Sequence, residues 1–169
     1  MLPMSDPVRS RDMYVSKQLR VPLDQMYWYV NNATEGWMPS GKPLHKFFAY
    51  STHDWTVAQS LLFFNATNGN FTNVPFASQF VIELHSTEGC TEESCFWVEV
   101  ISNGTPLTFE DICITRNGTC TYSEFHELLN AKGFVHSDSG YRTQCAEPWA
   151  PPTSLRELLF LQRMLLKYI

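Results

Sequence analysis

The sequence lacks an excess of basic residues. Its 169 residues include 12 lysines and arginines against 17 aspartates and glutamates, which gives a net charge of -5 and an isoelectric point near 5.5. A protein that follows the phosphates of a nucleic acid needs a basic face, so this balance argues against nucleic acid as a partner. Any anionic ligand must therefore be held by local geometry.

The sequence also lacks a signal peptide of the usual kind, since its first twenty residues, "MLPMSDPVRSRDMYVSKQLR", contain no apolar core region. Other features nevertheless indicate the secretory route. N-glycosylation acceptor motifs occur at five asparagines, which is hard to attribute to chance in so short a chain. They are Asn32, Asn65, Asn70, Asn103 and Asn117.

The cysteine spacing agrees with an oxidising compartment. Cys90 and Cys95 flank one short polar loop, and Cys113 and Cys120 flank another, so each pair could close a small disulfide ring. Zinc is the alternative, but the spacings are not those of a zinc knuckle, and we expect no metal. Cys145 has no local partner, and this odd thiol, with the absent signal peptide, leads us to expect a further segment upstream.

A chain of this length is expected to form one domain with a hydrophobic core. We expect a loosely held start over the first dozen residues, and then a helix through residues 23–33 with Pro22 in its first turn. The apolar run "LHKFFAYS", residues 44–51, is typical of a buried strand in a parallel sheet. A helix over residues 56–64 follows, so the order is that of half an α/β unit.

From residue 78 the hydrophobic period changes to two. Alternating segments on either side of Cys90 and Cys95 predict a hairpin, with a disulfide at its tip. Asn103-Gly104 predicts a tight turn and a third strand around residues 105–110. The predicted fold class is therefore α/β: a partial, mostly parallel sheet with flanking helices, plus an antiparallel hairpin or meander.

Two capping boxes, Thr121–Glu124 and Ser154–Glu157, each predict the start of a helix. The first helix is expected to end at Gly133. The second forms an amphipathic C-terminal segment, residues 151–169, which is too short and too charged to span a bilayer. Its apolar face is expected to pack on protein, with docking at a membrane surface as the alternative.

The adjacent His53 and Asp54 stand between the predicted strand and the helix that follows it. Ligands collect at the carboxyl ends of parallel strands, and the first amides of a helix attract anions. His53 could donate a hydrogen bond to a phosphoryl oxygen, and a protonated Asp54 could give its proton to a departing alkoxide. Alternatively, Asp54 is only the N-cap of the helix and His53 a buried structural histidine. The catalytic role requires Asp54 to face a cleft, rather than to be held only by amides of its own helix.

Over residues 12–148 the order of motifs resembles the C-terminal part of the histidine acid phosphatases. The resemblance is carried by "FAYSTHDWTV", by the Val-Pro-Phe-Ala-Ser string at residues 74–78, by Glu83 in the next strand, and by the late cysteines. It implies that residues 1–150 form part of a histidine phosphatase α/β domain, about half of that fold. It also implies Asp54 as the proton donor, His53 as a phosphoryl ligand, and a far-upstream partner for Cys145.

The family hydrolyses phosphomonoesters through a phosphohistidine, and its nucleophile lies in an Arg-His-Gly motif. None of the five histidines here is preceded by arginine or followed by glycine. We interpret the four besides His53 as structural or solvated: His45, His85, His126 and His136. We therefore expect an acid phosphatase to which this chain supplies the general acid but not the nucleophile, so that the chain alone is inactive.

The resemblance further implies a small phosphomonoester substrate, no cofactor, and a lysosomal or extracellular location. The expected partner is the missing N-terminal half of the same domain, and the open edge of a partial sheet could also support a homo-oligomer. The alternative is a secreted glycoprotein that keeps the fold as a binding module or pseudo-enzyme and has lost the chemistry.

Overall fold

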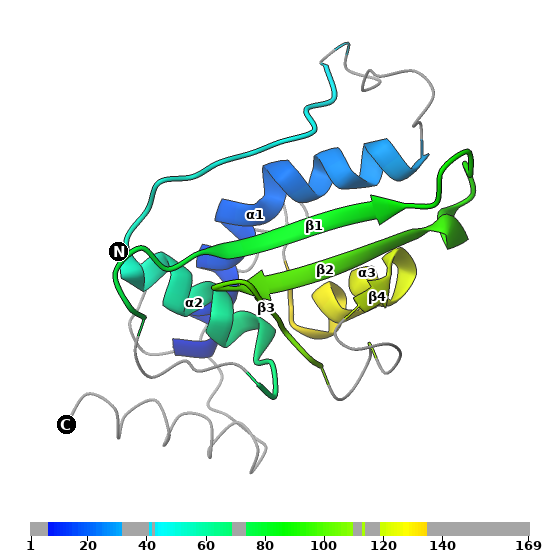
Figure 1. The fold of residues 1–169 in the computed structure, drawn as a ribbon. Coiled ribbons are helices and arrows are strands. Elements are labelled where there is room, and N and C mark those ends of the chain that lie inside the picture. The colour runs from blue at the N-terminus through cyan, green and yellow to red at the C-terminus, as the bar shows by residue number, and fades with distance from the viewer. Residues whose placement is uncertain are drawn as a thin grey trace, which may run out of the picture.

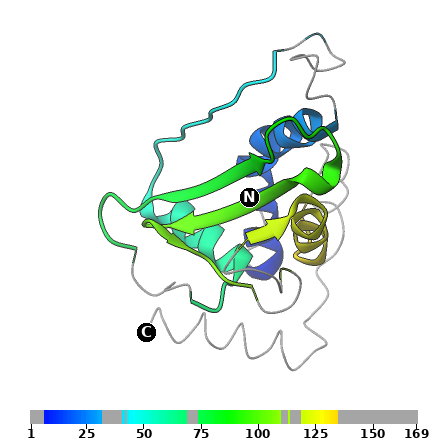
Figure 2. The same ribbon diagram turned by 45° about the vertical axis from the view of Figure 1, so that its right-hand side comes forward.

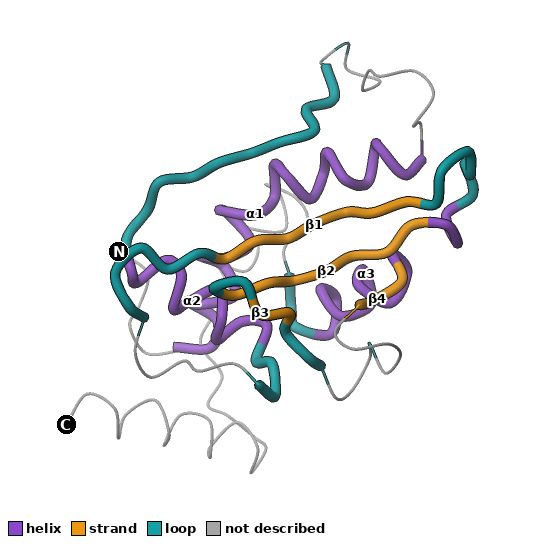
Figure 3. The backbone as a smooth tube through the Cα atoms, viewed as in Figure 1, coloured by secondary structure: helices purple, strands orange, loops and turns teal. Residues whose placement is uncertain are grey.

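The computed structural model describes residues 7–31, 41, 43–68, 74–109, 113 and 119–134. Helices, strands and one short 3₁₀ turn alternate along these ranges (Figures 1 and 3). In chain order they are α1 (Pro7–Asn31), α2 (Asp54–Phe64), β1 (Phe80–Ser86), η1 (Glu93–Cys95), β2 (Phe96–Ser102), β3 (Thr105–Pro106), β4 (Thr119–Thr121) and α3 (Tyr122–Ala131). The predicted C-terminal helix lies outside the described residues.

The described strands form one antiparallel sheet of four strands. β1 pairs with β2 along its full length, from Phe80 opposite Ser102 to Ser86 opposite Phe96, and β3 and β4 both pair with β2. The predicted hairpin and third strand are confirmed, but the prediction of a mostly parallel sheet is wrong. Tight connections such as Asn103–Gly104 can join only antiparallel neighbours, whereas parallel strands need a long crossover.

The turn between β2 and β3 is also tied to the residue before β1. Asn103 has a positive φ of 49°, as the central position of such a turn requires. Its Oδ1 accepts a hydrogen bond from the backbone N–H of Gln79 (2.8 Å), and its own N–H donates to the Gln79 carbonyl (3.0 Å). Asn103 thus joins the end of β2 to the start of β1 through its side chain and its backbone.

Residues 44–51, predicted as a buried strand, belong to none of the described strands. They run as an extended segment toward α2 (Figure 1), and the side chain of Phe47 is 82% exposed. An apolar run becomes a buried strand only where a neighbouring strand satisfies its backbone, and the described strands offer it no such partner. The helix that follows is confirmed as α2, which begins two residues earlier than predicted, at Asp54.

α1 is longer than the sequence pattern indicates. It begins at Pro7, so the expectation of a loose start is wrong from that residue onward, and Pro22 lies inside the helix rather than in its first turn. An internal proline removes one N–H and clashes with the preceding turn, and the helix changes direction along its length in Figures 1 and 2. Tertiary packing of buried Met13 and Val15 keeps the helix continuous despite this cost.

The hydrophobic core lies between one face of the sheet and the three helices (Figure 2). Phe96, Val98 and Val100 of β2 are buried on this face, so the residues between them point to the opposite face. Phe64 of α2 is fully buried, and its ring stacks on that of Phe125 of α3 at 6.1 Å. The α/β character of the fold is thus built around an antiparallel sheet with helices on one side.

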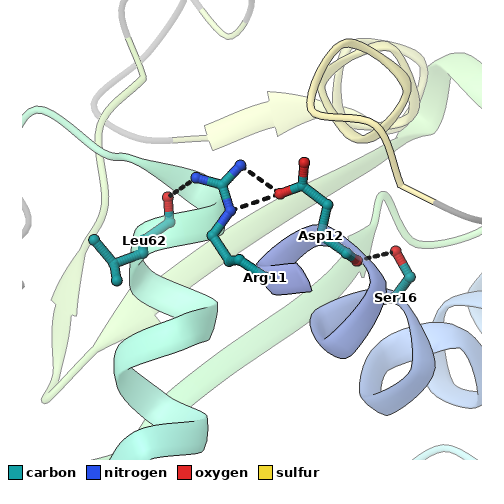
Figure 4. A network of polar contacts seen from close by, with 4 residues as sticks. All are labelled: Arg11, Asp12, Ser16 and Leu62. Atoms are coloured by element: carbon teal, nitrogen blue, oxygen red, sulfur yellow. Dashed lines mark hydrogen bonds and ion pairs between the residues drawn. The ribbon is translucent and has the colours of Figure 1, made fainter. Parts of the chain in front are cut away.

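A buried arginine, ion-paired within α1, links that helix to α2 (Figure 4). Arg11 pairs with Asp12, and its Nη1 donates a hydrogen bond to the carbonyl of Leu62 (3.2 Å). The Arg11 guanidinium also lies over the Phe63 ring. Because Leu62 is in the last turn of α2, a cation there complements both its unpaired carbonyl and the helix dipole.

The capping box of α3 is present as predicted and offers a local test. Thr121 Oγ1 accepts from the Glu124 N–H (3.2 Å), and Glu124 Oε2 accepts from the Thr121 N–H (2.8 Å). We expect Thr121→Ala to lower the free energy of unfolding by about 1 kcal/mol, measured by urea denaturation, because one helix N–H loses its partner. Ser123→Ala, at an exposed position of the same turn, should change it by less than about 0.5 kcal/mol. Equal effects of the two substitutions would contradict the capping role.

Candidate functional site

His53 and Asp54 occupy the N-terminus of α2. His53 is the N-cap residue: its backbone is extended (φ -92°, ψ 161°), and its carbonyl accepts from the N–H groups of Thr56 (3.0 Å) and Val57 (3.4 Å). Its side chain makes no capping hydrogen bond and is exposed. The alternative of a buried structural histidine, with Asp54 as the N-cap, is therefore wrong.

Asp54 is the first residue of α2, and its side chain is exposed. Its Oδ1 accepts a hydrogen bond from the backbone N–H of Trp55 (2.7 Å). A carboxylate at this end of a helix is favourable because it complements the positive end of the helix dipole. The Asp54 side chain thus contacts an amide of its own helix, whereas a proton donor must face a cleft.

A small network of hydroxyl groups holds the segment that carries His53. Thr56 Oγ1 lies 2.9 Å from the Tyr14 hydroxyl. The same Thr56 Oγ1 accepts a hydrogen bond from Thr52 Oγ1 (2.6 Å). The network links α1, the start of α2 and the extended segment before it. Tyr14 and Thr56 were not among the predicted site residues, and no local sequence pattern connects positions so far apart.

Aromatic side chains are exposed at the start of α2 and in the segments before α2 and β1. Trp55 follows Asp54 directly, and the loop before β1, which carries Phe76, lies beside the same end of α2 in Figures 1 and 2. Phe47, Trp55 and Phe76 are all exposed. Large apolar side chains exposed in this way are more typical of a contact surface than of a solvated loop. The string Val74–Ser78 is thus placed near the His-Asp pair.

A cavity of about 250 Å³ lies elsewhere, between α1 and α3, and the His-Asp pair does not line it. Burial raises the pKa of Asp24 at its wall, an effect that Arg20 partly opposes. Burial also raises the pKa of Tyr122, and the nearby Glu93 adds to the increase. The side chains that line the cavity are those of Leu23, Asp24, Met26, Tyr27, Tyr122, Phe125, His126 and Leu129.

Both predicted disulfides are present. Cys90–Cys95 closes the tip of the β1–β2 hairpin, with Cα atoms 6.0 Å apart. Cys113–Cys120 joins the chain after β3 to β4, with Cα atoms 4.8 Å apart and both side chains buried. Both separations lie in the usual range. The two disulfides are compatible with a secreted protein.

Several other predicted residues can be placed. Asn65 and Asn103 are exposed, so their acceptor motifs are accessible. His45 is exposed, whereas His126 is half-buried on α3, with Nδ1 3.3 Å from Asn130 Nδ2. Outside the described residues lie Asn32, Asn70, Asn117, His136, Cys145 and the Ser154 capping box.

Comparison of the chain with family models, with curated proteins and with solved structures gave no match. Among the described helices, none combines the length and apolar character needed to cross a bilayer.

Proposed function

We propose that the chain supplies the acid half of a phosphomonoesterase site, as in histidine acid phosphatases. Asp54 protonates the leaving group and His53 binds the phosphoryl group. The observation that carries this proposal is an exposed His-Asp pair at the first turn of α2, within an ordered string of motifs that continues through residues 74–78 and Glu83. A pair that served only the core would be buried, and this one is not.

The site also needs groups other than the backbone of α2 to bind the phosphoryl group. The N–H groups of Trp55, Thr56 and Val57 already have partners, so the start of α2 has little capacity left to bind an anion through its backbone. The phosphoryl group must then be bound by His53 and by cationic side chains that the site still has to recruit. Asp54 must also leave the Trp55 amide, or share it, when a substrate approaches.

The nucleophile is proposed to come from polypeptide that carries an Arg-His-Gly motif, because none of the histidines here has that context. Such a segment would also cover the aromatic side chains Phe47, Trp55 and Phe76 and enclose Asp54. Excluding water from the site in this way strengthens its electrostatic interactions. The complete protein is proposed to reside in the lysosome or outside the cell.

Hydrolysis of 4-nitrophenyl phosphate at acid pH tests the proposal. The 169-residue chain alone should show no turnover. Fusion to an upstream segment that carries the Arg-His-Gly motif should restore it, and the same fusion with that histidine replaced by alanine should not. Turnover by the chain alone, or a well-folded but inactive fusion, would overturn the assignment.

A second candidate is a secreted glycoprotein without chemistry, and one observation favours it: Asp54 is exposed and bonded to its own helix. In that case the native protein has a mass of 19.5 kDa plus glycans and binds phosphate esters without turnover. A much larger native mass would favour the phosphatase instead. Mass spectrometry of the natural product distinguishes the two.

A further inference from the structure

Three metal-ligating side chains meet on the face of the sheet that points away from the helices. Glu83 and His85 lie two residues apart on β1, and Glu99 lies directly opposite Glu83 on β2. Because Val98 and Val100 point into the core, Glu99 between them must point to this other face, which is toward the viewer in Figure 1. The strand register thus brings Glu99 to the pair that β1 already presents on one face.

The distances suit a single small cation. His85 Nε2 lies 3.2 Å from Glu83 Oε2 and 3.8 Å from Glu99 Oε2, and one ligand atom from each residue lies within 4.8 Å of the other two. Zinc binds nitrogen and oxygen ligands at about 2.0–2.2 Å in tetrahedral geometry, which places its ligand atoms about 3.4 Å from one another. The two separations from His85 Nε2 are close to this value, and the two carboxylate oxygens lie within 4.8 Å of each other.

The imidazole nitrogen is unsatisfied. His85 Nε2 is shielded from solvent, and although the Glu83 and Glu99 carboxylates lie within ion-pair distance, it makes no hydrogen bond among the described residues. The His85 ring stacks on Trp97, with ring centroids 5.5 Å apart and planes at 7°, and this contact fixes the direction in which Nε2 points. A buried nitrogen without a partner is costly, so it calls for a ligand or a proton.

The two carboxylates also call for a cation. Glu83 and Glu99 are directly opposite each other across the strands, an arrangement that destabilises a sheet when both carry the same charge. Their side chains are 45% and 26% exposed, so water screens them incompletely. A protonated His85 would compensate only part of this charge, whereas a divalent ion would compensate all of it and satisfy Nε2 as well.

We propose that Glu83, His85 and Glu99 bind one divalent transition-metal ion, with Zn²⁺ as the first choice. One imidazole nitrogen and two carboxylate oxygens are ligands that this ion accepts, and three protein ligands leave a fourth position for water or another group. Both strands of the hairpin contribute ligands, so the bound ion links β1 to β2. The proposal is independent of the phosphatase assignment, and it departs from the expectation that the chain holds no metal.

Isothermal titration calorimetry of the metal-free full chain with ZnCl₂ tests the proposal. We expect saturable binding of one ion per chain, and a rise in the melting temperature with Zn²⁺ concentration, because the ion binds only the folded state. Loss of an outer-shell partner typically weakens metal binding by about 10–100-fold. His85→Gln and Glu99→Gln each remove a direct ligand, so each should weaken binding by more than that. Both positions are partly exposed, so each variant should keep the melting temperature of the metal-free parent within a few degrees.

His45→Gln is the matched control, because His45 is an exposed histidine that lies outside the cluster. It should leave the affinity for Zn²⁺ unchanged. Titration with Co²⁺ gives a second readout, since tetrahedral cobalt develops visible absorption bands that should be absent in His85→Gln. The proposal is overturned by the absence of saturable binding, or by binding that survives both substitutions in the cluster.

Discussion

In a protein that also carries the Arg-His-Gly segment, Asp54→Asn is expected to slow the hydrolysis of alkyl phosphates by about 10²–10⁴-fold, the usual contribution of a general acid. An alkoxide needs a proton as it leaves, whereas 4-nitrophenolate is stable as an anion. The loss for 4-nitrophenyl phosphate should therefore be much smaller. Steady-state kcat/KM for the two substrates gives the comparison.

The structure makes this substitution easy to interpret. The asparagine Oδ1 can still accept the hydrogen bond from the Trp55 N–H, so the first turn of α2 is retained. The loss of a charge near the helix dipole costs only about 0.3–1 kcal/mol of stability. Glu88→Gln, which removes an exposed carboxylate elsewhere, should leave both rates unchanged. Equal losses for the two substrates in Asp54→Asn would exclude the proton-donor role.

Phe64→Ala is expected to lower the free energy of unfolding by about 3–5 kcal/mol. The side chain is 0% exposed and contacts aromatic rings from several elements: its centroid lies 5.5 Å from that of Phe80 and 6.1 Å from those of Phe109 and Phe125. Truncation would leave a cavity that all of these rings border, and close-packed rings can fill it only in part. Urea denaturation with a shared m-value measures the effect.

Phe47→Ala is the matched control, because it removes the same ring from a side chain that is 82% exposed. We expect a change within about 0.5 kcal/mol, as for other exposed positions. A loss at Phe64 no larger than that at Phe47 would mean that the core between α2, β1 and α3 is not packed as described.

The features that the sequence predicted correctly depend on short-range interactions. The capping box at Thr121 joins groups three residues apart, and the Cys90–Cys95 hairpin is defined by alternation within one stretch. The direction of strand pairing and the fate of residues 44–51 depend instead on partners elsewhere in the chain. An apolar octapeptide has the same pattern whether a neighbouring strand covers it or not, so sequence alone could not show that Phe47 is exposed.

The same distinction applies to the candidate sites. The position of His53 and Asp54 at a helix start was predictable, because a polar pair and an apolar helical run are adjacent in the sequence. The Tyr14 contact with Thr56 was not, since it depends on how α1 packs against α2. The meeting of Glu83 with Glu99 was likewise hidden, because a shift of one residue in register would move every side chain of β1 to the other face.

The two functional ends of the Asn103 amide have separate uses. The oxygen fastens the β2–β3 turn to Gln79, whereas an N-linked sugar would be attached to the nitrogen. Glycosylation can therefore proceed without disturbing the fastening. Asn103→Ala would remove both the hydrogen bond to Gln79 and the glycosylation site. Thr105→Ala removes only the acceptor motif and keeps the Asn103 amide, so it is the better variant for comparing the protein with and without the sugar.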